Sequence, residues 1–318
     1  MSNSVLITDD CHEYLRDGLA GMGYRCDFEP DITDPQTRER IPDYAGLIVN
    51  SKIRVDRDFL DRASRLKFIG RLGSGMEMID RDYAAQRGVR VIGSPAGNAN
   101  AVAEQALGML LALAANLARA GREMRQLIWR REANRGWELM GKTIGIIGFG
   151  HTGRRFGGKL AGLGVRILAY DKYKTDYASG MSWVQEADLE QIQREADVIS
   201  LHLPLTPETA GLVDARFLAS CKPGVALINT SRGACVRTAD LLDALRCGQV
   251  SGACLDVFEN EKPHTYTPQE EAMYRELLNL DQVVATPHIA GWTRESKYRM
   301  AEILLDGIRR ITTAEGLI

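Results

Sequence analysis

One stretch of the chain, residues 141–171, limits the possible folds more than any other. It reads GKTIGIIGFGHTGRRFGGKLAGLGVRILAYD. A short apolar run is followed at once by Gly148-Phe149-Gly150-His151-Thr152-Gly153. A helix-like segment comes next, and a second apolar run then ends at Asp171. This order of strand, glycine turn, helix, strand and acid predicts a βαβ unit.

Each part of this unit suits a bound dinucleotide. Gly148 permits a tight turn, Gly150 lets the backbone approach a pyrophosphate, and Gly153 lets the helix pack close to the strand. The helix N-terminus offers free N–H groups and the positive end of its dipole to the phosphates. Asp171 stands 18 residues after Gly153, which is close to the spacing of an acid that binds the ribose hydroxyls. The stretch therefore predicts a dinucleotide-binding domain.

The glycine pattern alone is a weak signal, because 31 of the 318 residues are glycine. A glycine-rich turn in an unrelated α/β protein is the alternative, but the flanking strands, the helix and the acid are separate requirements, and all are met. A carboxylate at Asp171 repels the 2′-phosphate of NADP, so we expect NAD as the cofactor. Lys172 and Lys174 lie just beyond this acid and leave acceptance of NADP open.

Composition excludes several classes of partner. The formal net charge is −2, so no basic field is present to hold nucleic acid or an anionic membrane. The first residues lack the pattern of a signal peptide, and the apolar segment from Ala106 to Ala118 is too short to span a bilayer. The six cysteines form no CxxC pair, and no cysteine or histidine cluster has metal-ligand spacing. We expect a cytoplasmic protein with reduced thiols and no metal.

The chain alternates strand and helix signals in two sets, which predicts two α/β domains with parallel sheets. The first set has candidate strands at Val5–Thr8, Arg25–Phe28, Leu47–Asn50, Lys67–Leu72 and Arg90–Ile92. A long helical run follows, from about Ala99 to about Leu127. The second set has six candidate strands, at Ile144–Ile147, Arg166–Tyr170, Val198–His202, Ala226–Thr230, Gly252–Asp256 and Val283–Thr286. They match a six-stranded doubly wound sheet, and residues 293–311 predict a final amphipathic helix.

Ligands of doubly wound sheets bind beyond the carboxyl ends of the strands. The residues expected there are Gly150 to Thr152, Asp171, His202-Leu203-Pro204, Thr230-Ser231-Arg232-Gly233, Asp256 and Pro287-His288. Hydride transfer to or from a nicotinamide needs a group that exchanges the proton on oxygen, and His288 has a suitable pKa. Glu261 is the candidate carboxylate behind it, and Arg232 is the candidate for forked hydrogen bonds to a substrate carboxylate. Each residue alone has a structural explanation, so the prediction depends on their joint placement.

Four ordered motifs resemble the signatures of the D-isomer-specific 2-hydroxyacid dehydrogenases. They are His202-Leu203-Pro204-Leu205-Thr206-Pro207-Glu208-Thr209, Asn229-Thr230-Ser231-Arg232-Gly233, Asp256-Val257-Phe258-Glu259-Asn260-Glu261 and Thr286-Pro287-His288-Ile289-Ala290-Gly291. With the glycine turn, the resemblance covers nearly the whole chain. It implies that Arg232, Glu261 and His288 are catalytic, with His288 as acid/base, Glu261 as its partner and Arg232 orienting the substrate.

The resemblance also implies the domains and the ligand contacts. Residues 1–97 and 292–318 would form a flavodoxin-like α/β substrate domain, and residues 98–291 the six-stranded Rossmann domain that binds NAD. In the first domain Leu72-Gly73-Ser74-Gly75-Met76 resembles a loop whose N–H groups bind the substrate carboxylate, with Ser74 and Gly75 as ligands beside Arg232. The implied cofactor residues are Gly148, Gly150, His151, Thr152, Gly153, Asp171, Leu203, Pro204, Thr209, Thr230, Ser231, Asp256 and Gly291. A closing motion between domains and a homodimer built through the cofactor domain are also implied.

Within the family the chain is most similar to the phosphoglycerate dehydrogenase-like branch, with departures that leave the substrate open. Asn50 stands where that branch commonly has an arginine for the substrate phosphate, although Lys52 and Arg54 are close. Lys262 separates Glu261 from Pro263. We expect reversible hydride transfer between NAD(H) and a small 2-hydroxy or 2-oxo acid, with 3-phosphoglycerate as one candidate substrate. The alternatives are a hydroxypyruvate or glyoxylate reductase and a non-catalytic NAD-sensing protein; Glu261 disfavours a formate dehydrogenase-like enzyme.

Overall fold

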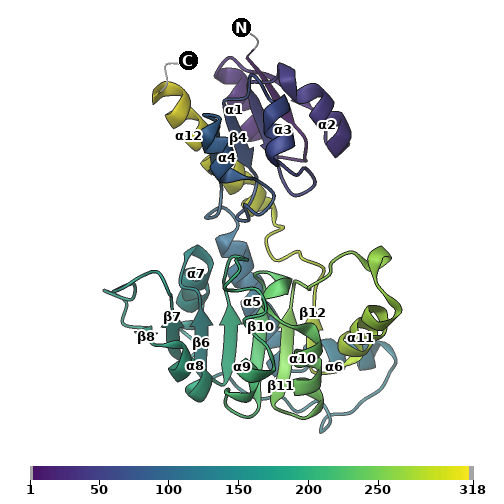
Figure 1. The fold of residues 1–318 in the computed structure, drawn as a ribbon. Helices are drawn as coiled ribbons and strands as arrows, with labels where there is room; N and C mark the ends of the chain where they lie inside the picture. Colours follow the sequence, from purple (N-terminus) through teal and green to yellow (C-terminus); the bar gives the residue numbers. More distant parts are fainter. Residues whose placement is uncertain (1–2, 315–318) are drawn as a thin grey trace. The chain divides into compact units, whose positions relative to one another are not determined.

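The computed structural model describes residues 3–314 and divides the chain into two compact units (Figure 1). Unit 1 comprises residues 1–99 and 292–318, and unit 2 comprises residues 100–291. Residues 1–2 and 315–318, which belong to the predicted first domain, lie outside the described residues. The two units are described separately below.

Unit 1 is built on a five-stranded parallel sheet with the order β2-β1-β3-β4-β5. Its strands are β1 (Ser4–Ile7), β2 (Arg25–Phe28), β3 (Gly46–Val49), β4 (Phe68–Arg71) and β5 (Arg90–Gly93). The residues of β1, β3 and β4 are all buried, as expected for strands that are covered on both faces. This strand order is that of flavodoxin-like sheets, so the predicted α/β class of the first domain is confirmed.

Helices cover both faces of this sheet and include the last helix of the chain. They are α1 (Glu13–Gly21), α2 (Asp34–Arg40), the 3₁₀ turn η1 (Ile41–Asp43), α3 (Arg57–Arg62), α4 (Arg81–Gln86) and α12 (Arg294–Ala314). Ala301, Leu304, Leu305 and Ile308 of α12 are fully buried in one apolar cluster with β1 and α1. Gly18 of α1 lies so close to α12 that a Cβ atom there would be 2.1 Å from Cδ2 of Leu305. The end of the chain therefore completes the core of unit 1.

Unit 2 contains a seven-stranded parallel sheet with the order β12-β11-β10-β9-β6-β7-β8. Its strands are β6 (Thr143–Ile147), β7 (Arg166–Tyr170), β8 (Gln185–Glu186), β9 (Val198–Leu201), β10 (Val225–Asn229), β11 (Val250–Leu255) and β12 (Val283–Ala285). The doubly wound class is confirmed, but the predicted count of six strands is wrong. The additional strand, β8, pairs with β7 over only two residues, too few to give a periodic signal in the sequence.

The helices of unit 2 pack on the two faces of its sheet. They are α5 (Ala99–Ala114), α6 (Leu117–Arg125), α7 (His151–Leu160), α8 (Leu189–Glu195), α9 (Ala215–Ala219), α10 (Thr238–Arg246) and α11 (Pro268–Asn279), with 3₁₀ turns η2 (Gly233–Cys235) and η3 (Pro263–Thr265). One buried cluster joins the sheet to α8, α9, α10 and α11, and a second joins it to α5 and α7. The strand order reverses between β6 and β9, which is where such sheets bind their ligands.

The single long helix predicted from about Ala99 to about Leu127 is wrong. Two helices occupy this region, with Asn116 between them in the left-handed conformation at φ 53°, and their axes are bent by 65°. Asn tolerates this backbone region better than most residues, and it interrupts the helical hydrogen bonds. Among the described helices none is by itself long and apolar enough to cross a membrane; α5 and α6 meet that criterion only when they are taken together.

Candidate active site

The glycine turn after β6 has the close contacts that its sequence predicts. Gly148 has a positive φ of 93°, and a Cβ atom there would lie 2.3 Å from the carbonyl oxygen of His202. A Cβ atom on Gly153 would lie 2.1 Å from the carbonyl oxygen of Gly148. At Gly150, the N-cap of α7, a Cβ atom would meet nothing within 4 Å. The first and third glycines are thus required by packing, while the second leaves open space in front of the helix N-terminus, which fits a pyrophosphate.

Asp171 lies beside this turn at the end of β7. Its carboxylate accepts hydrogen bonds from the N–H groups of Phe149 and Tyr173, both at 3.1 Å. The ammonium group of Lys174 lies 3.3 Å from the same carboxylate and donates to the carbonyl oxygen of Phe149 at 2.9 Å. Asp171 is therefore held next to the glycine turn, as an acid that binds ribose hydroxyls needs to be, but it is paired with a lysine.

The segment after β9 packs against the glycine turn at Gly148. His202 packs its ring 5.3 Å from that of Phe156, and burial lowers the pKa of His202 to about 3, so the imidazole is neutral. The hydroxyl of Thr209 donates to the carbonyl oxygen of Pro204 at 2.7 Å and closes the turn that they share. A Cβ atom on Gly148 would lie 3.1 Å from Cδ2 of Leu203. These predicted cofactor residues lie together along one edge of the glycine turn.

The turn after β10 is fixed by a buried side chain. Asn229 donates from Nδ2 to the carbonyl oxygen of Arg232 at 2.9 Å, and its Oδ1 accepts from the N–H and hydroxyl of Ser231. Arg232 donates from Nη1 to the carbonyl oxygen of Ser231 at 2.7 Å. The buried Oγ1 of Thr230 has no hydrogen-bond partner among the residues that the structure describes. Since buried hydroxyls are normally paired, this atom fits a contact with a bound ligand.

Gly233 brings this turn against the loop after β11. A Cβ atom on Gly233 would lie only 1.8 Å from the backbone carbonyl oxygen of Phe258. The N–H of Phe258 in turn donates to Oε1 of Glu261 at 3.3 Å. The close backbone contact therefore places the loops that carry Arg232 and Glu261 next to each other, which the sequence motifs alone do not reveal.

His288 and Glu261 form the pair that the sequence predicts. Nδ1 of His288 lies 2.8 Å from Oε2 of Glu261, and both side chains are partly exposed. The hydrogen bond to Glu261 raises the pKa of His288; burial opposes this rise, and the charges of Glu261 and Asp256 reinforce it. Burial alone would raise the pKa of Glu261, but the hydrogen bond and charge of His288 outweigh it, and the pKa lies below its usual range. With Nδ1 facing the carboxylate, Nε2 is left for a ligand.

Asp256 shapes the backbone that carries His288. This aspartate is 1% exposed, and its carboxylate accepts hydrogen bonds from the hydroxyl of Thr286 at 2.5 Å and from the N–H groups of Ile289 and Ala290, both at 2.9 Å. Its carbonyl oxygen accepts from the N–H of His288 at 2.7 Å. His288 itself has φ 55°, a conformation that a non-glycine residue adopts at a cost. Asp256 therefore acts in this structure as the anchor of the His288 turn.

In unit 1 the predicted substrate loop follows β4. The N–H of Gly73 donates to the hydroxyl of Ser94 at 3.0 Å, while Ser74 is exposed and Gly75 is buried. Directly behind this loop lies Arg71, which is 9% exposed and donates to Oδ1 of Asn50 at 2.7 Å. A Cβ atom on Gly73 would lie 2.4 Å from Nη1 of Arg71. Sequence reasoning missed this arginine, whose only signal is a charged residue at the end of a buried apolar strand.

The two cations suggested in place of the missing arginine are placed differently. The ammonium group of Lys52 donates to the carbonyl oxygen of Pro30, and the backbone N–H of Arg54, not its guanidinium, donates to Asp34 at 3.1 Å. The buried cation beside Asn50 is Arg71 instead. Within residues 3–314, no group of three or more His, Cys, Asp or Glu side chains is placed to hold a metal ion.

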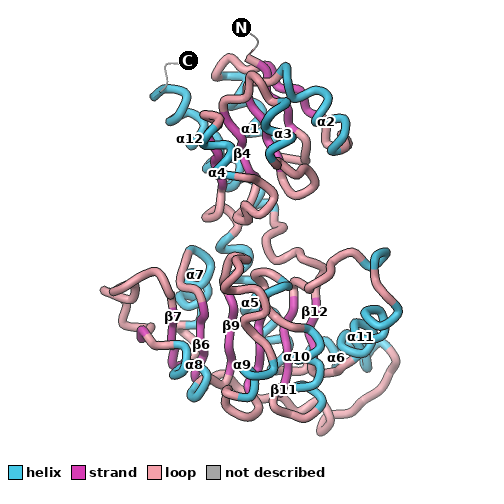
Figure 2. The backbone as a smooth tube through the Cα atoms, in the orientation of Figure 1, coloured by secondary structure: helices cyan, strands magenta, loops and turns pink. Residues whose placement is uncertain are grey.

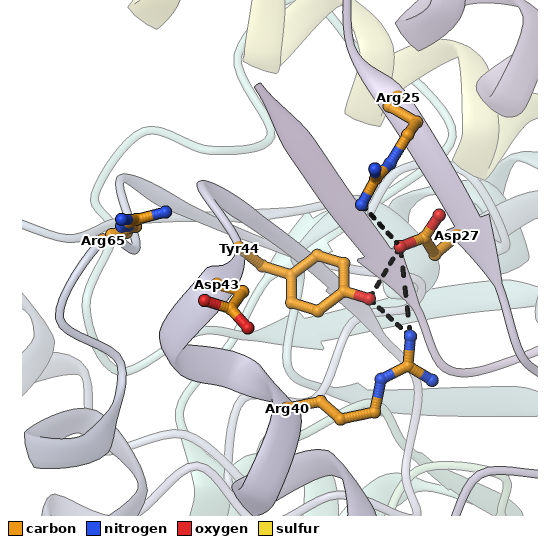
Figure 3. A pocket seen from close by; sticks show the side chains of 6 residues that line it. All are labelled: Arg25, Asp27, Arg40, Asp43, Tyr44 and Arg65. Carbon is orange, nitrogen blue, oxygen red and sulfur yellow. Dashed lines mark hydrogen bonds and ion pairs between the residues drawn. The ribbon is translucent and has the colours of Figure 1, made fainter. Parts of the chain in front are cut away.

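Unit 1 also contains a hollow of about 360 Å³, which the predicted substrate loop does not line (Figure 3). It is lined by Arg25, Asp27, Arg40, Asp43, Tyr44 and Arg65. The hydroxyl of Tyr44 donates to Asp27 at 2.7 Å and accepts from Arg40 at 2.6 Å. Burial and the bond to Asp27 raise the pKa of Tyr44 to about 12. The hollow lies where β2, β3 and β4 begin, whereas ligands of such sheets bind at the carboxyl ends.

The chain is similar to known proteins over most of its length. Residues 107–290 match the protein-family model described as D-isomer specific 2-hydroxyacid dehydrogenase, NAD binding domain. The chain is 38% identical over 275 residues to a protein of Mycobacterium leprae (strain TN) named D-3-phosphoglycerate dehydrogenase, covering 86% of this chain and 50% of that protein. It is 37% identical over 268 residues to a Thermotoga maritima protein named hydroxypyruvate reductase, covering 84% of this chain and 85% of that one.

A solved structure of D-lactate dehydrogenase from Aquifex aeolicus, complexed with NAD and lactic acid, has a similar fold. It aligns with a TM-score of 0.82 at 27% identity, covering 98% of this chain and 96% of that one. The chain spans about half the length of the curated phosphoglycerate dehydrogenase named above. Because the family model covers more than half of the sequence and the Thermotoga maritima relative is matched over most of both lengths, the chain belongs to the D-isomer specific 2-hydroxyacid dehydrogenase family.

Proposed function

We propose that this protein is an NAD-dependent oxidoreductase that acts on the CH–OH group of a D-2-hydroxy acid. It transfers hydride reversibly between NAD(H) and a small 2-hydroxy or 2-oxo acid. The observation that carries this proposal is the pair of His288 and Glu261, whose Nδ1 and Oε2 atoms lie 2.8 Å apart. The pair lies at the same carboxyl edge of the sheet as the glycine turn, where a nicotinamide cofactor binds in doubly wound sheets.

The chemistry divides between the cofactor and the protein. When bound, the cofactor supplies the hydride for C2 of the 2-oxo acid or accepts it from C2 of the hydroxy acid. In the reducing direction His288 donates the proton on Nε2 to the carbonyl oxygen, and in the oxidising direction it takes the proton back. Glu261 holds the imidazole in one orientation and stabilises its protonated form. Arg232 orients the substrate through forked hydrogen bonds.

We assign the cofactor to the strand ends of unit 2. The N–H groups at the start of α7 bind the pyrophosphate, Asp171 binds the ribose hydroxyls, and the unpartnered Oγ1 of Thr230 lies at the nicotinamide end. The full set of proposed contacts is Gly148, Gly150, His151, Thr152, Gly153, Asp171, Leu203, Pro204, Thr209, Thr230, Ser231, Asp256 and Gly291. The catalytic residues are Arg232, Glu261 and His288.

The substrate carboxylate is proposed to bind the backbone N–H groups of Ser74 and Gly75, which form an anion nest, together with Arg232. The candidate substrates are 3-phosphoglycerate with its oxo acid, and an unphosphorylated acid such as hydroxypyruvate or glyoxylate. Arg71 is the buried cation behind the loop, but it is 9% exposed and already donates to Asn50. Its burial leaves little of the guanidinium surface for a substrate phosphate and favours the unphosphorylated acid.

The test is the consumption of NADH, followed by its absorbance, with phosphohydroxypyruvate, hydroxypyruvate, glyoxylate and pyruvate. We expect turnover, with the highest kcat/KM for an unphosphorylated acid. A strong preference for phosphohydroxypyruvate would reverse the substrate assignment and leave the hydride chemistry intact. Binding of NADH without turnover of any of the four acids would support the NAD-sensing alternative instead.

We further propose a homodimer formed through unit 2 and a cytoplasmic location without nucleic-acid or membrane partners. Support for the dimer comes from residues 126–142, an arm without helix or strand (Figure 2). Its Leu127, Trp129 and Met140 are 92%, 75% and 74% exposed, and large exposed apolar surface is typical of interaction sites. Support for the location comes from the cysteines, all of which are free thiols, and from the net charge of −2.

A further inference from the structure

We infer that the adenosine end of the proposed cofactor site also accepts a 2′-phosphate, so that the protein uses NADP(H) as well as NAD(H). This inference rests on the proposed function. It starts from a hollow of about 370 Å³ beside the glycine turn. The hollow is lined by Phe149, Arg154, Lys174, Thr175, Asp176, Tyr177 and Ser179.

The acid that normally excludes NADP is partly neutralised here. A carboxylate at the end of the second strand repels the 2′-phosphate when its charge is uncompensated. In this protein Nζ of Lys174 lies 3.3 Å from Oδ2 of Asp171 and is held there by the carbonyl oxygen of Phe149 at 2.9 Å. Oδ1 of Asp171 accepts from the N–H of Tyr173 and has an acceptor site left for a ribose hydroxyl, because each carboxylate oxygen has about two such sites. Its repulsion of a phosphate is offset by the adjacent ammonium group.

The hollow adds a second cation from another element. Arg154 lies in the first turn of α7 and forms no ion pair within the described part of the chain. Lys174 approaches from the loop after β7, and Thr175 and Ser179 line the same hollow with hydroxyl groups. An arginine, a lysine and hydroxyls are the donors that bind phosphate in proteins. Asp176 is the one acid among the lining residues.

The balance of charge predicts that the site accepts both NAD(H) and NADP(H) and does not prefer NADP(H). Arg154 and Lys174 together match the charges of Asp171 and Asp176, so the subsite is neither strongly negative nor strongly positive. Lys172 does not contribute, because it forms an ion pair with Glu208 at 2.7 Å and does not line the hollow. It therefore provides a matched control, a lysine two positions away with the same charge and a different neighbour.

The experiment measures the dissociation constants of NADH and NADPH for the full chain by their fluorescence, with 2′,5′-ADP and 5′-AMP as competing probes. We expect NADPH to bind within about tenfold of NADH and 2′,5′-ADP to compete at least as well as 5′-AMP. Lys174→Ala and Arg154→Ala should each weaken NADPH about tenfold or more, the loss expected for one charge-assisted hydrogen bond. Binding of NADH should change by less than about threefold, which also reports that the variants are folded. Lys172→Ala should leave the ratio of the NADH and NADPH dissociation constants unchanged.

Two results would overturn this inference and leave the proposed function intact. One is tight binding of NADH with NADPH more than about a hundredfold weaker, a difference of about 2.7 kcal/mol. The other is an equal loss of NADH and NADPH affinity in Lys174→Ala. Failure of the wild-type protein to bind either nucleotide would overturn the proposed function as well, so the two failures are distinguishable.

Discussion

His288 combines two features at the residue scale that seldom occur together by chance. Its backbone lies in the left-handed region at φ 55°, and its side chain is hydrogen bonded to Glu261. Strained backbone of this kind persists where the surroundings over-determine it, and here the buried carboxylate of Asp256 fixes both sides of the turn. The strained backbone therefore fixes the orientation of the His288 imidazole.

The hydrogen bond between His288 and Glu261 leads to a prediction about the pH dependence of the reaction. Because Glu261 raises the pKa of His288, the proton needed for reduction is retained above the usual value of about 6.5. The kcat/KM for a 2-oxo acid should fall as the pH rises through this raised pKa, and the kcat/KM for the hydroxy acid should rise through it. Glu261→Gln removes the largest cause of the raised His288 pKa. The pH at which kcat/KM changes should therefore be lower in both directions of the reaction, and kcat/KM should drop by about 10² or more.

The measurement is the pH profile of kcat/KM in both directions for Glu261→Gln. Glu271→Gln is the control, because Glu271 lies on α11 and pairs only with the exposed Arg275. An unchanged pH dependence of kcat/KM in Glu261→Gln would show that Glu261 is not the partner of His288.

Asp256 should prove to be a positioning residue. Asp256→Asn replaces an acceptor with an NH₂ group that faces a backbone N–H, so one buried donor is left unpaired at a cost of about 1–3 kcal/mol. We expect a lower Tm and a lower kcat, because the turn that carries His288 loses one of its hydrogen bonds to Asp256. Asp243→Asn is the control, since Asp243 is an exposed residue of α10. Normal kcat together with a lower Tm would show that Asp256 only stabilises the fold.

The sequence predicts His288, Glu261 and Arg232 because each lies in a motif at the end of an apolar strand. It does not predict Arg71, because an arginine inside a buried strand gives no periodic or spacing signal. The guanidinium is accommodated only through contacts such as that with Asn50, 21 positions away. The close contact of Gly233 with the backbone of Phe258 is likewise set by packing between loops.

At the scale of elements, most strands are predictable since each is a short apolar run that ends in a turn. The exceptions are β8, whose two residues depend on pairing with β7, and the break between α5 and α6. Both helices are rich in good helix formers, so local propensity predicts one continuous helix. The left-handed conformation of Asn116 and the hydrogen bond from the N–H of Trp137 to the carbonyl oxygen of Ala114, at 2.9 Å, end α5 through contacts that are distant in sequence.

The contact between α1 and α12 gives a prediction at this scale. Gly18→Ala places a Cβ atom 2.1 Å from Cδ2 of Leu305, and overpacking of this kind costs about 1–3 kcal/mol. Gly21→Ala, on the same helix but with nothing within 4 Å of its Cβ position, should be neutral or stabilising by up to about 1 kcal/mol.

The readout is the midpoint of urea unfolding for Gly18→Ala, Gly21→Ala and Leu305→Ala, with the double variant Gly18→Ala/Leu305→Ala completing the cycle. The double variant should be less destabilised than the sum of its two single changes, because the smaller side chain makes room for the new methyl group. Strict additivity would show that the two helices do not press on each other at this point.

At the scale of the whole molecule, the arm of residues 126–142 carries three large apolar side chains that face solvent, those of Leu127, Trp129 and Met140. Glu123 of α6, only 7% exposed, accepts a hydrogen bond from Nδ2 of Asn134 at 2.7 Å and forms an ion pair with Arg130, so the arm is tied to the unit that carries it. Burying its apolar surface would remove it from water at about 25 cal/mol per Å². The proposed homodimer would cover this surface with a second copy of the chain.

The prediction is that the wild-type chain sediments at twice its mass of 35.2 kDa and that Leu127→Asp/Trp129→Asp sediments as a single chain at micromolar concentration. Two charges placed in an apolar interface leave unpaired ions on both copies, which costs several kcal/mol. Leu278→Asp is the control, because Leu278 lies on α11 and is 49% exposed outside the arm; this variant should remain a dimer. A wild-type chain that sediments as a monomer would contradict the assignment, whereas a dimer that survives both charges would place the interface on another surface of unit 2.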